Sequence, residues 1–253
     1  MSADRTRDLQ VVGHSVRKVD SLGLACGQEL YVADYATPDT LVGYVVPSPY
    51  AHARIKRIDA TRARAIAGVH AVLTHEDIPR IAHTTAGQGY VEPSPYDNFV
   101  LDSKVRFVGD RVALIAAETL EIAEEAGKAL DIEWEMLDPI FDPDHAMDEG
   151  APIIHDEPEA HMPIPVPYDP KRNMAAGANM GDGDIEQALR TSPKVYSRDF
   201  STQYAQHCPI EPHVTLGYLD ARNRVVLITS TRSRSTRDAS PLRLSASRSS
   251  GCG

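Results

Sequence analysis

Three residues in the C-terminal part of the chain carry side chains that bind transition metals: His207, Glu211 and His213. Imidazole nitrogen and carboxylate oxygen both suit zinc or iron. However, the spacing places the three residues neither on one face of a helix nor on one face of a strand. We therefore interpret them as structural polar residues, and the sequence assigns no metal ligand to this chain.

Other groups of polar residues also favour structural roles. Residues 181–184, Gly-Asp-Gly-Asp, begin like a calcium loop but lack its remaining oxygen ligands, so we predict a turn that caps a helix. Residues 87–89, Gly-Gln-Gly, lack the third glycine of a dinucleotide-binding fingerprint and are interpreted as a loop. His145, His155 and His161 lie among prolines, and we expect them to be solvated. No catalytic or cofactor-binding residue is assigned either.

Composition limits the class of protein. The 253 residues are 42% hydrophobic and 25% charged, which is typical of a globular protein. No apolar run approaches the ~20 residues that span a bilayer, and the net charge of −10 argues against nucleic acid as a partner. Cys26, Cys208 and Cys252 form no C-x-x-C pair, so neither an iron–sulfur nor a zinc site is predicted. Scattered cysteines favour the cytoplasm.

Predicted strands and helices alternate between residues 22 and 141. The apolar residues 41–46 predict a buried strand that ends at Pro47, and Thr119 is the predicted N-cap of a helix that ends at residue 130. The further predicted elements are a short helix capped by Asp59, strands over residues 55–58, 69–74, 102–107, 111–117 and 132–134, and a turn at residues 109–110. This mixture indicates an α/β or α+β layer structure.

The remaining sequence divides into a connector and a second unit. Residues 142–172 contain seven prolines, which predicts an extended, polyproline-like connector. A second unit begins near Asn173, with a helix capped by Asp184. Its strand candidates are residues 195–203, 214–219 and 224–229. Because these strands have few partners in the remaining sequence, we expect this unit to be incomplete.

The most informative stretch is residues 48–55, Ser-Pro-Tyr-Ala-His-Ala-Arg-Ile. Pro47 and Pro49 cannot donate to a strand ladder, so the stretch is predicted to be a turn between two strands. His52 is predicted to be a turn histidine that hydrogen-bonds to the backbone. A turn alone does not explain the order of these eight residues.

That order resembles the opening domain of the molybdenum hydroxylases, the xanthine dehydrogenase and aldehyde oxidase family. Similar stretches follow the family's order at residues 12–20, 27–34, 68–74, 105–113, 132–135, 181–188 and 206–212. The matching region in the family is the N-terminal part of the large, molybdopterin-binding subunit. The resemblance implies an α/β (α+β) hammerhead domain, followed by the incomplete start of a mixed α/β molybdopterin-binding domain.

The resemblance also gives an expected domain division. Residues 1–21 are the N-terminal lead-in and residues 22–141 the hammerhead domain. Residues 142–172 are the proline-rich connector, and residues 173–231 the start of the molybdopterin-binding domain. Residues 232–253 form a separate arginine- and serine-rich tail.

The tail differs in composition from the rest of the chain, since residues 232–253 contain five arginines and seven serines. In the family a glutamine follows the Ser-Thr pair that ends the preceding strand, whereas Arg232 follows Thr231 here. Regrouping permitted codons by one base restores Gln-Val-Pro-Phe and a family-like continuation. We favour an out-of-frame translation over a genuine RNA-binding tail.

The resemblance implies that full-length relatives hydroxylate an aldehyde, a purine or another N-heterocycle, with water as the source of oxygen. They use a molybdenum–molybdopterin cofactor and pass electrons to FAD-binding and 2Fe-2S subunits. This chain is expected to be an N-terminal fragment that binds no cofactor and is inactive alone, with the remainder of the large subunit as a further partner. The alternative is a non-catalytic hammerhead module that docks on partner hydroxylase subunits.

Overall fold

A computed structural model describes residues 9–28, 30–85, 94–178 and 180–230 of the chain. The described residues fall into two compact units. The large unit comprises residues 39–203, and the small unit combines residues 9–38 with residues 204–230. The predicted loop at residues 87–89 and the predicted tail at residues 232–253 lie outside the described residues.

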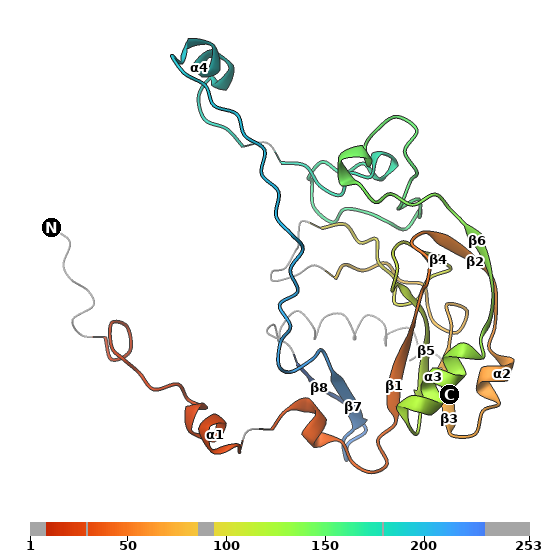
Figure 1. The fold of residues 1–253 in the computed structure, drawn as a ribbon. Helices are drawn as coiled ribbons and strands as arrows, with labels where there is room; N and C mark the ends of the chain where they lie inside the picture. The colour runs from red at the N-terminus through yellow and green to blue at the C-terminus, as the bar shows by residue number, and fades with distance from the viewer. Residues whose placement is uncertain (1–8, 29, 86–93, 179, 231–253) are drawn as a thin grey trace. The chain divides into compact units, whose positions relative to one another are not determined.

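The first sheet of the large unit has the strand order β1-β5-β3, with every neighbouring pair antiparallel (Figure 1). Strand β1 is Val42–Pro47, β5 is Arg111–Ala117 and β3 is Val69–Leu73. All three were predicted from their apolar residues. Pro47 is the last residue of an edge strand, where its missing N–H costs no ladder hydrogen bond, and the register shifts there.

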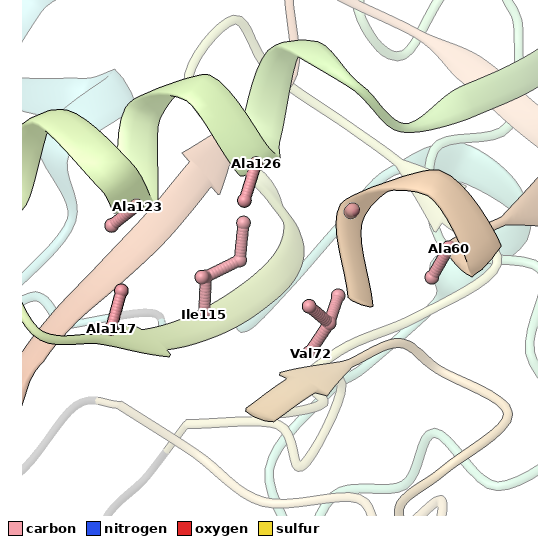
Figure 2. Close-up of a cluster of buried hydrophobic side chains, with 7 residues drawn as sticks. Ala60, Val72, Ile115, Ala117, Ala123 and Ala126 are labelled. Atoms are coloured by element: carbon pink, nitrogen blue, oxygen red, sulfur yellow. The ribbon is translucent and has the colours of Figure 1, made fainter. Parts of the chain in front are cut away.

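Helix α3, Leu120–Lys128, packs on one face of this sheet. Its start is confirmed as predicted, since the Thr119 side chain accepts a hydrogen bond from the Ile122 N–H. Figure 2 shows Ala123 and Ala126 pointing from α3 toward Ala117 and Ile115 of β5. These small side chains let the helix lie close to the sheet, and the packed residues form the first hydrophobic core.

A short helix, α2 (Thr61–Arg64), completes this core with Ala60 and Ala63. Its predicted N-cap was one residue early, because Ala60 holds the N-cap position. The Asp59 carboxylate nevertheless accepts a hydrogen bond from the Thr61 N–H at 2.9 Å.

The second sheet of the large unit has the order β4-β2-β6, also antiparallel. Strand β2 is Ala53–Asp59, β6 is Asp131–Met136 and β4 is only Lys104–Val105. The second core lies on this sheet; its fully buried members are Ala53, Ile55, Ile58, Val105 and Val112. Two antiparallel sheets formed from one continuous stretch of chain, with helices beside them, are typical of layered α+β folds.

Residues 102–117 were predicted as a strand, a turn and a strand, and the structure has β4, a turn and β5 there. The two strands do not pair with each other, because they belong to different sheets. The reason lies in Asp110, whose carboxylate accepts hydrogen bonds from the N–H groups of Arg106 and Arg111. Gly109 beside it has a φ of +95°, a conformation that favours glycine. The turn therefore redirects the chain from one sheet to the other.

Residues 142–172 contain two short 3-10 helices, η2 (Pro143–His145) and η3 (Pro170–Arg172). The rest of this segment is irregular, but it is not a free connector, since it hydrogen-bonds to the large unit as described below. Helix α4, Ile185–Thr191, follows, and Asp184 caps it by accepting a hydrogen bond from the Gln187 N–H. The turn predicted at residues 181–184 is thus confirmed as a helix cap.

The small unit joins both ends of the described chain. It contains α1 (Ser21–Cys26), the 3-10 helix η1 (Val32–Tyr35), and a hairpin of β7 (Thr215–Leu219) and β8 (Val225–Thr229). Both hairpin strands were predicted. The strand predicted at residues 195–203 was wrong, because no described strand pairs with that segment. Among the described helices, none is long and apolar enough to cross a membrane.

We predict that Ile115→Ala lowers the free energy of unfolding of the large unit by about 2–5 kcal/mol, because it leaves a cavity beneath α3. Urea unfolding followed by the fluorescence of Trp134, the single tryptophan, measures this change. Ile185→Ala on the exposed face of α4 is the control and should have little effect. Equal effects of the two substitutions would contradict the position of this core.

Candidate functional site

The turn at residues 48–55 is fixed to the turn at residues 106–111. The Ser48 N–H donates to the Asp110 carbonyl at 2.7 Å, and the Gly109 N–H donates to the Ser48 carbonyl at 2.8 Å. The buried Ser48 hydroxyl also accepts a hydrogen bond from the Tyr50 N–H at 3.0 Å. These bonds hold the most family-like stretch of the sequence in one conformation.

His52 is buried in this turn, with 3% of its surface exposed. Its Nδ1 lies 2.7 Å from the carbonyl oxygen of Asp138, which only accepts, so Nδ1 carries the proton and donates. The His52 carbonyl in turn accepts from the Leu137 N–H. The prediction of a turn histidine bonded to the backbone is confirmed. Its Nε2 is buried without a partner, and burial lowers the pKa of His52 below 6.5.

Beside this turn, the ammonium group of Lys104 is buried on strand β4, with 3% of the side chain exposed. Its Nζ donates to the Asp156 carboxylate and to the Ile154 carbonyl, each at 2.7 Å. Burial lowers the pKa of Lys104, although the bond to Asp156 opposes this shift. Burial would raise the pKa of Asp156, but hydrogen bonds from Lys104 and Arg54 outweigh it and lower that pKa to about 2.

Further ion pairs continue from Lys104 along the same edge. The Arg106 guanidinium bonds to Asp102 at 2.8 Å and also to Glu157. Arg80 bonds to Asp102 at 3.1 Å and to Glu159 at 2.6 Å. We call this set the ion-pair cluster; its members are Arg54, Arg80, Asp102, Lys104, Arg106, Asp156, Glu157 and Glu159. It fastens residues 153–159 to strands β2 and β4.

The cluster binds a polypeptide segment and leaves no group free for acid–base catalysis. Each of its carboxylates bonds to a cation that also bonds elsewhere. A general acid or base needs a titratable group that reaches a substrate. Within the described ranges, no three His, Cys, Asp or Glu side chains are grouped to hold a metal ion. The charges of the cluster hold one segment of the large unit against another.

The three histidines of residues 142–172 differ in their surroundings. His145 and His161 are exposed, as expected. The expectation of a solvated His155 was wrong, because its ring is largely buried between two carboxylates. Its Nδ1 lies 3.3 Å from Glu157 and its Nε2 lies 3.8 Å from Asp97. The acidic segment folds back on the basic edge of the second sheet and carries His155 with it.

The candidate metal ligands of the small unit do not converge. Glu211 accepts a hydrogen bond from the Val32 N–H at 3.1 Å, which links the segment before β7 to η1. The rings of His207 and His213 lie edge to face, with centroids 6.2 Å apart. Both side chains are exposed. Their interpretation as structural polar residues stays a prediction.

Two family models match the chain. The model of the aldehyde oxidase and xanthine dehydrogenase a/b hammerhead domain matches residues 26–138, and that of the molybdopterin cofactor-binding domain matches residues 167–239. The chain belongs to the xanthine dehydrogenase and aldehyde oxidase family. The turn at residues 48–55 lies in the hammerhead domain, as the resemblance implied, and so do five of the eight residues of the ion-pair cluster.

Curated relatives agree with this assignment. The chain is 36% identical to the probable hypoxanthine oxidase XdhD of Escherichia coli K12, over 89% of the chain and 26% of the relative. It is 34% identical to the nicotinate dehydrogenase large molybdopterin subunit of Eubacterium barkeri, over 89% of the chain and 48% of the relative. The chain therefore spans about a quarter to a half of the length of these relatives.

Solved structures share the fold. Quinoline 2-oxidoreductase from Pseudomonas putida 86 has a TM-score of 0.71 at 23% identity, covering 92% of this chain and 28% of that one. Aldehyde oxidoreductase from Desulfovibrio gigas has a TM-score of 0.64 at 24% identity, covering 84% of this chain and 23% of that one. The fold is a hammerhead domain followed by the start of a molybdopterin-binding domain.

The cofactor of the full-length family is molybdenum–molybdopterin. The described residues do not by themselves fit this group. In the described part of the match to the cofactor-binding domain, Tyr168 is the one buried side chain with an unpartnered polar atom. One hydroxyl group does not make a pterin-binding site, which needs several converging donors and acceptors.

The sequence did contain a signal for the ion-pair cluster. Asp102, Lys104 and Arg106 alternate along one short extended segment, so they share one face. Three charges on one face of a strand that packs in a core require partners of opposite sign. The acidic run of Asp156, Glu157 and Glu159 supplies them, but nothing local in the sequence joins the two segments.

We predict that Lys104→Met lowers the free energy of unfolding by about 1–3 kcal/mol, because it leaves the Asp156 carboxylate and the Ile154 carbonyl without their buried donor. Urea unfolding measures the change. Arg57→Met is the matched control, since Arg57 pairs with Asp131 at an exposed position, where an ion pair contributes little to stability. If Lys104→Met lowers the free energy of unfolding no more than Arg57→Met does, the stabilising role of Lys104 in the ion-pair cluster is contradicted.

A second prediction concerns the pH dependence of stability. The unfolded chain protonates residue 52 near pH 6.5, whereas the buried His52 resists protonation. The free energy of unfolding should therefore fall as the pH falls through that region. His52→Asn keeps a donor for the Asp138 carbonyl and should flatten this slope between about pH 7 and pH 5. Urea titrations at several pH values test this; an unchanged slope would contradict it.

In His52→Asn the dependence of the free energy of unfolding on pH will not vanish entirely. Burial also lowers the pKa of His83 and His155, and both residues remain. His145→Asn provides the opposite control, because pairing with Asp148 raises the pKa of His145. Without that pair, the free energy of unfolding should fall slightly more steeply as the pH falls.

Proposed function

We propose that this chain is part of the molybdopterin-binding subunit of a molybdenum hydroxylase, an oxidoreductase that hydroxylates an aldehyde, a purine or an N-heterocycle with water as the oxygen source. One observation carries the proposal: the hammerhead and cofactor-binding models match consecutive parts of the chain, at residues 26–138 and 167–239. When bound, the cofactor supplies the redox chemistry. The printed names of the relatives include a probable hypoxanthine oxidase and a nicotinate dehydrogenase.

The role of this chain within such an enzyme is structural. Its described residues build a scaffold with paired charges and gather no catalytic group. The proposed partners are FAD-binding and 2Fe-2S subunits and the remainder of the large subunit, and the proposed location is the cytoplasm. The relatives are large subunits of multi-subunit enzymes, which supports partner subunits in general.

The domain division remains a proposal: a lead-in over residues 1–21, the hammerhead domain over residues 22–141, a connector over residues 142–172 and the start of the cofactor-binding domain over residues 173–231. The tail at residues 232–253 is proposed to be out of frame. The cofactor-domain match runs to residue 239, seven residues past Arg232. Sequencing the DNA over codons 228–253 tests the proposal; finding no family-like second frame would refute it.

The second candidate function is a non-catalytic hammerhead module that docks on hydroxylase subunits. Large apolar side chains that are exposed within the hammerhead match favour it; among them are Phe107, Val108, Leu120 and Met136. Such side chains on a soluble surface often mark an interaction site. Copurification of intact hydroxylase subunits with the chain, without the chain being needed for turnover, would favour this alternative.

We predict that the purified full chain contains no stoichiometric molybdenum or pterin and oxidises neither aldehydes nor hypoxanthine with an artificial electron acceptor. The reason is that its described residues do not form the cofactor site. Elemental analysis by mass spectrometry, pterin fluorescence and an anaerobic dye-reduction assay measure these properties. Metal-dependent turnover by the chain alone would refute the scaffold role.

A further inference from the structure

The turn at residues 181–184, just before helix α4, contains two aspartates in different chemical surroundings. Asp182 precedes Gly183, and this is the single Asp-Gly pair among the 253 residues. Asp184 precedes the β-branched Ile185, and its carboxylate accepts the 2.8 Å hydrogen bond that caps α4. Of the two carboxylates, the second is therefore held in place by the fold.

The peptide bond between Asp182 and Gly183 lies in an open, unpaired part of this turn. Both residues are exposed. Gly183 has a φ of +73°, and a Cβ added there would meet no atom within 4 Å. Across the part of the chain that the structure describes, no group hydrogen-bonds to the Gly183 N–H or pairs with the Asp182 carboxylate. A glycine without such contacts lets the backbone rotate with little steric cost, so the Gly183 nitrogen can reach the carboxyl carbon of Asp182.

We infer that Asp182 is a modification site, at which the chain forms isoaspartate. The Gly183 nitrogen attacks the side-chain carboxyl carbon of Asp182, so that a C–N bond forms while the hydroxyl group leaves as water with the amide proton. The product is a five-membered succinimide ring. Water then adds to the main-chain carbonyl of this ring and the C–N bond there breaks, which leaves residue 182 linked to Gly183 through its side chain. One water molecule leaves and one enters, and no atom is oxidised or reduced.

Asp184 provides an internal comparison, because it lies in the same exposed turn but should resist the same reaction. Its carboxylate is held by the Gln187 N–H at the start of α4. The nitrogen that would attack belongs to Ile185, whose branched side chain restricts the approach. Two aspartates only two positions apart therefore differ in both of the features that permit ring closure.

The isomer also creates a group that a partner enzyme can recognise. Isoaspartate adds one methylene to the main chain at residue 182 and leaves a carboxylate on its α-carbon, just before the N-cap of α4. Enzymes that repair isoaspartate transfer a methyl group from S-adenosylmethionine to that carboxylate. The partner that the site implies is thus an isoaspartyl methyltransferase. The inference does not depend on the proposed function.

The test is to incubate the purified full chain at neutral pH and physiological temperature and to follow isoaspartate over time. Methyl transfer from S-adenosylmethionine by a protein isoaspartate methyltransferase gives the amount, and peptide mass spectrometry with electron-transfer fragmentation gives the position. Isoaspartate should accumulate at residue 182 several times faster than at residue 184. Asp182→Glu is the matched variant: it keeps the charge, but its carboxyl group would have to close a less favourable six-membered ring, so modification at this position should be lost.

Circular dichroism and Trp134 fluorescence verify that the Asp182→Glu variant folds. Absence of isoaspartate at residue 182, equal rates at residues 182 and 184, or unchanged methyl acceptance by Asp182→Glu would each overturn the inference. The same incubation in guanidinium chloride tests the contribution of the folded turn. Because the turn leaves Asp182 and Gly183 unpaired, the rate at residue 182 should change little on unfolding. A rate that rises strongly would mean that the folded turn protects Asp182, which would also overturn the inference.

Discussion

A buried ammonium group determines how the large unit is assembled. Lys104 lies on a strand of two residues, and its charge leaves water only because one carboxylate and a backbone carbonyl accept its hydrogen bonds. Those acceptors come from residues 153–159, some fifty positions later. The acidic segment must therefore pack against β4 before that edge of the second sheet is complete. Neighbouring pairs from Arg80 and Arg106 extend the same constraint.

Local signals in the sequence predicted the strands and the caps well. Thr119 and Asp184 cap helices through side-chain bonds within three residues, and β7 and β8 follow from their own apolar residues. Long-range partners were not predictable in the same way. The sequence did not show that β4 and β5 lie in different sheets, or that residues 153–159 bind β4 through Lys104 and Asp156, because these partners lie far apart along the chain.

The order of residues 48–55 also has a physical account. Ser48 and His52 direct their polar atoms into backbone bonds with two other segments, so the turn joins β1, the turn at residues 106–111 and the end of β6. The turn with the most informative resemblance to the family is therefore held by three elements of the hammerhead domain. This stretch carried the first resemblance to the family, whereas the charged side chains of the ion-pair cluster pair with one another and hold residues 153–159 in place.

The small unit has a consequence for the order of folding during synthesis. The bond between the Val32 N–H and Glu211 joins residues 179 positions apart. Glu211 must therefore leave the ribosome before the Val32 N–H acquires this partner, by which time the large unit between the two residues has been synthesised. Closing so long a loop is entropically cheaper once the intervening residues are compact. The bond that ties η1 to the segment before β7 can therefore form only late in translation.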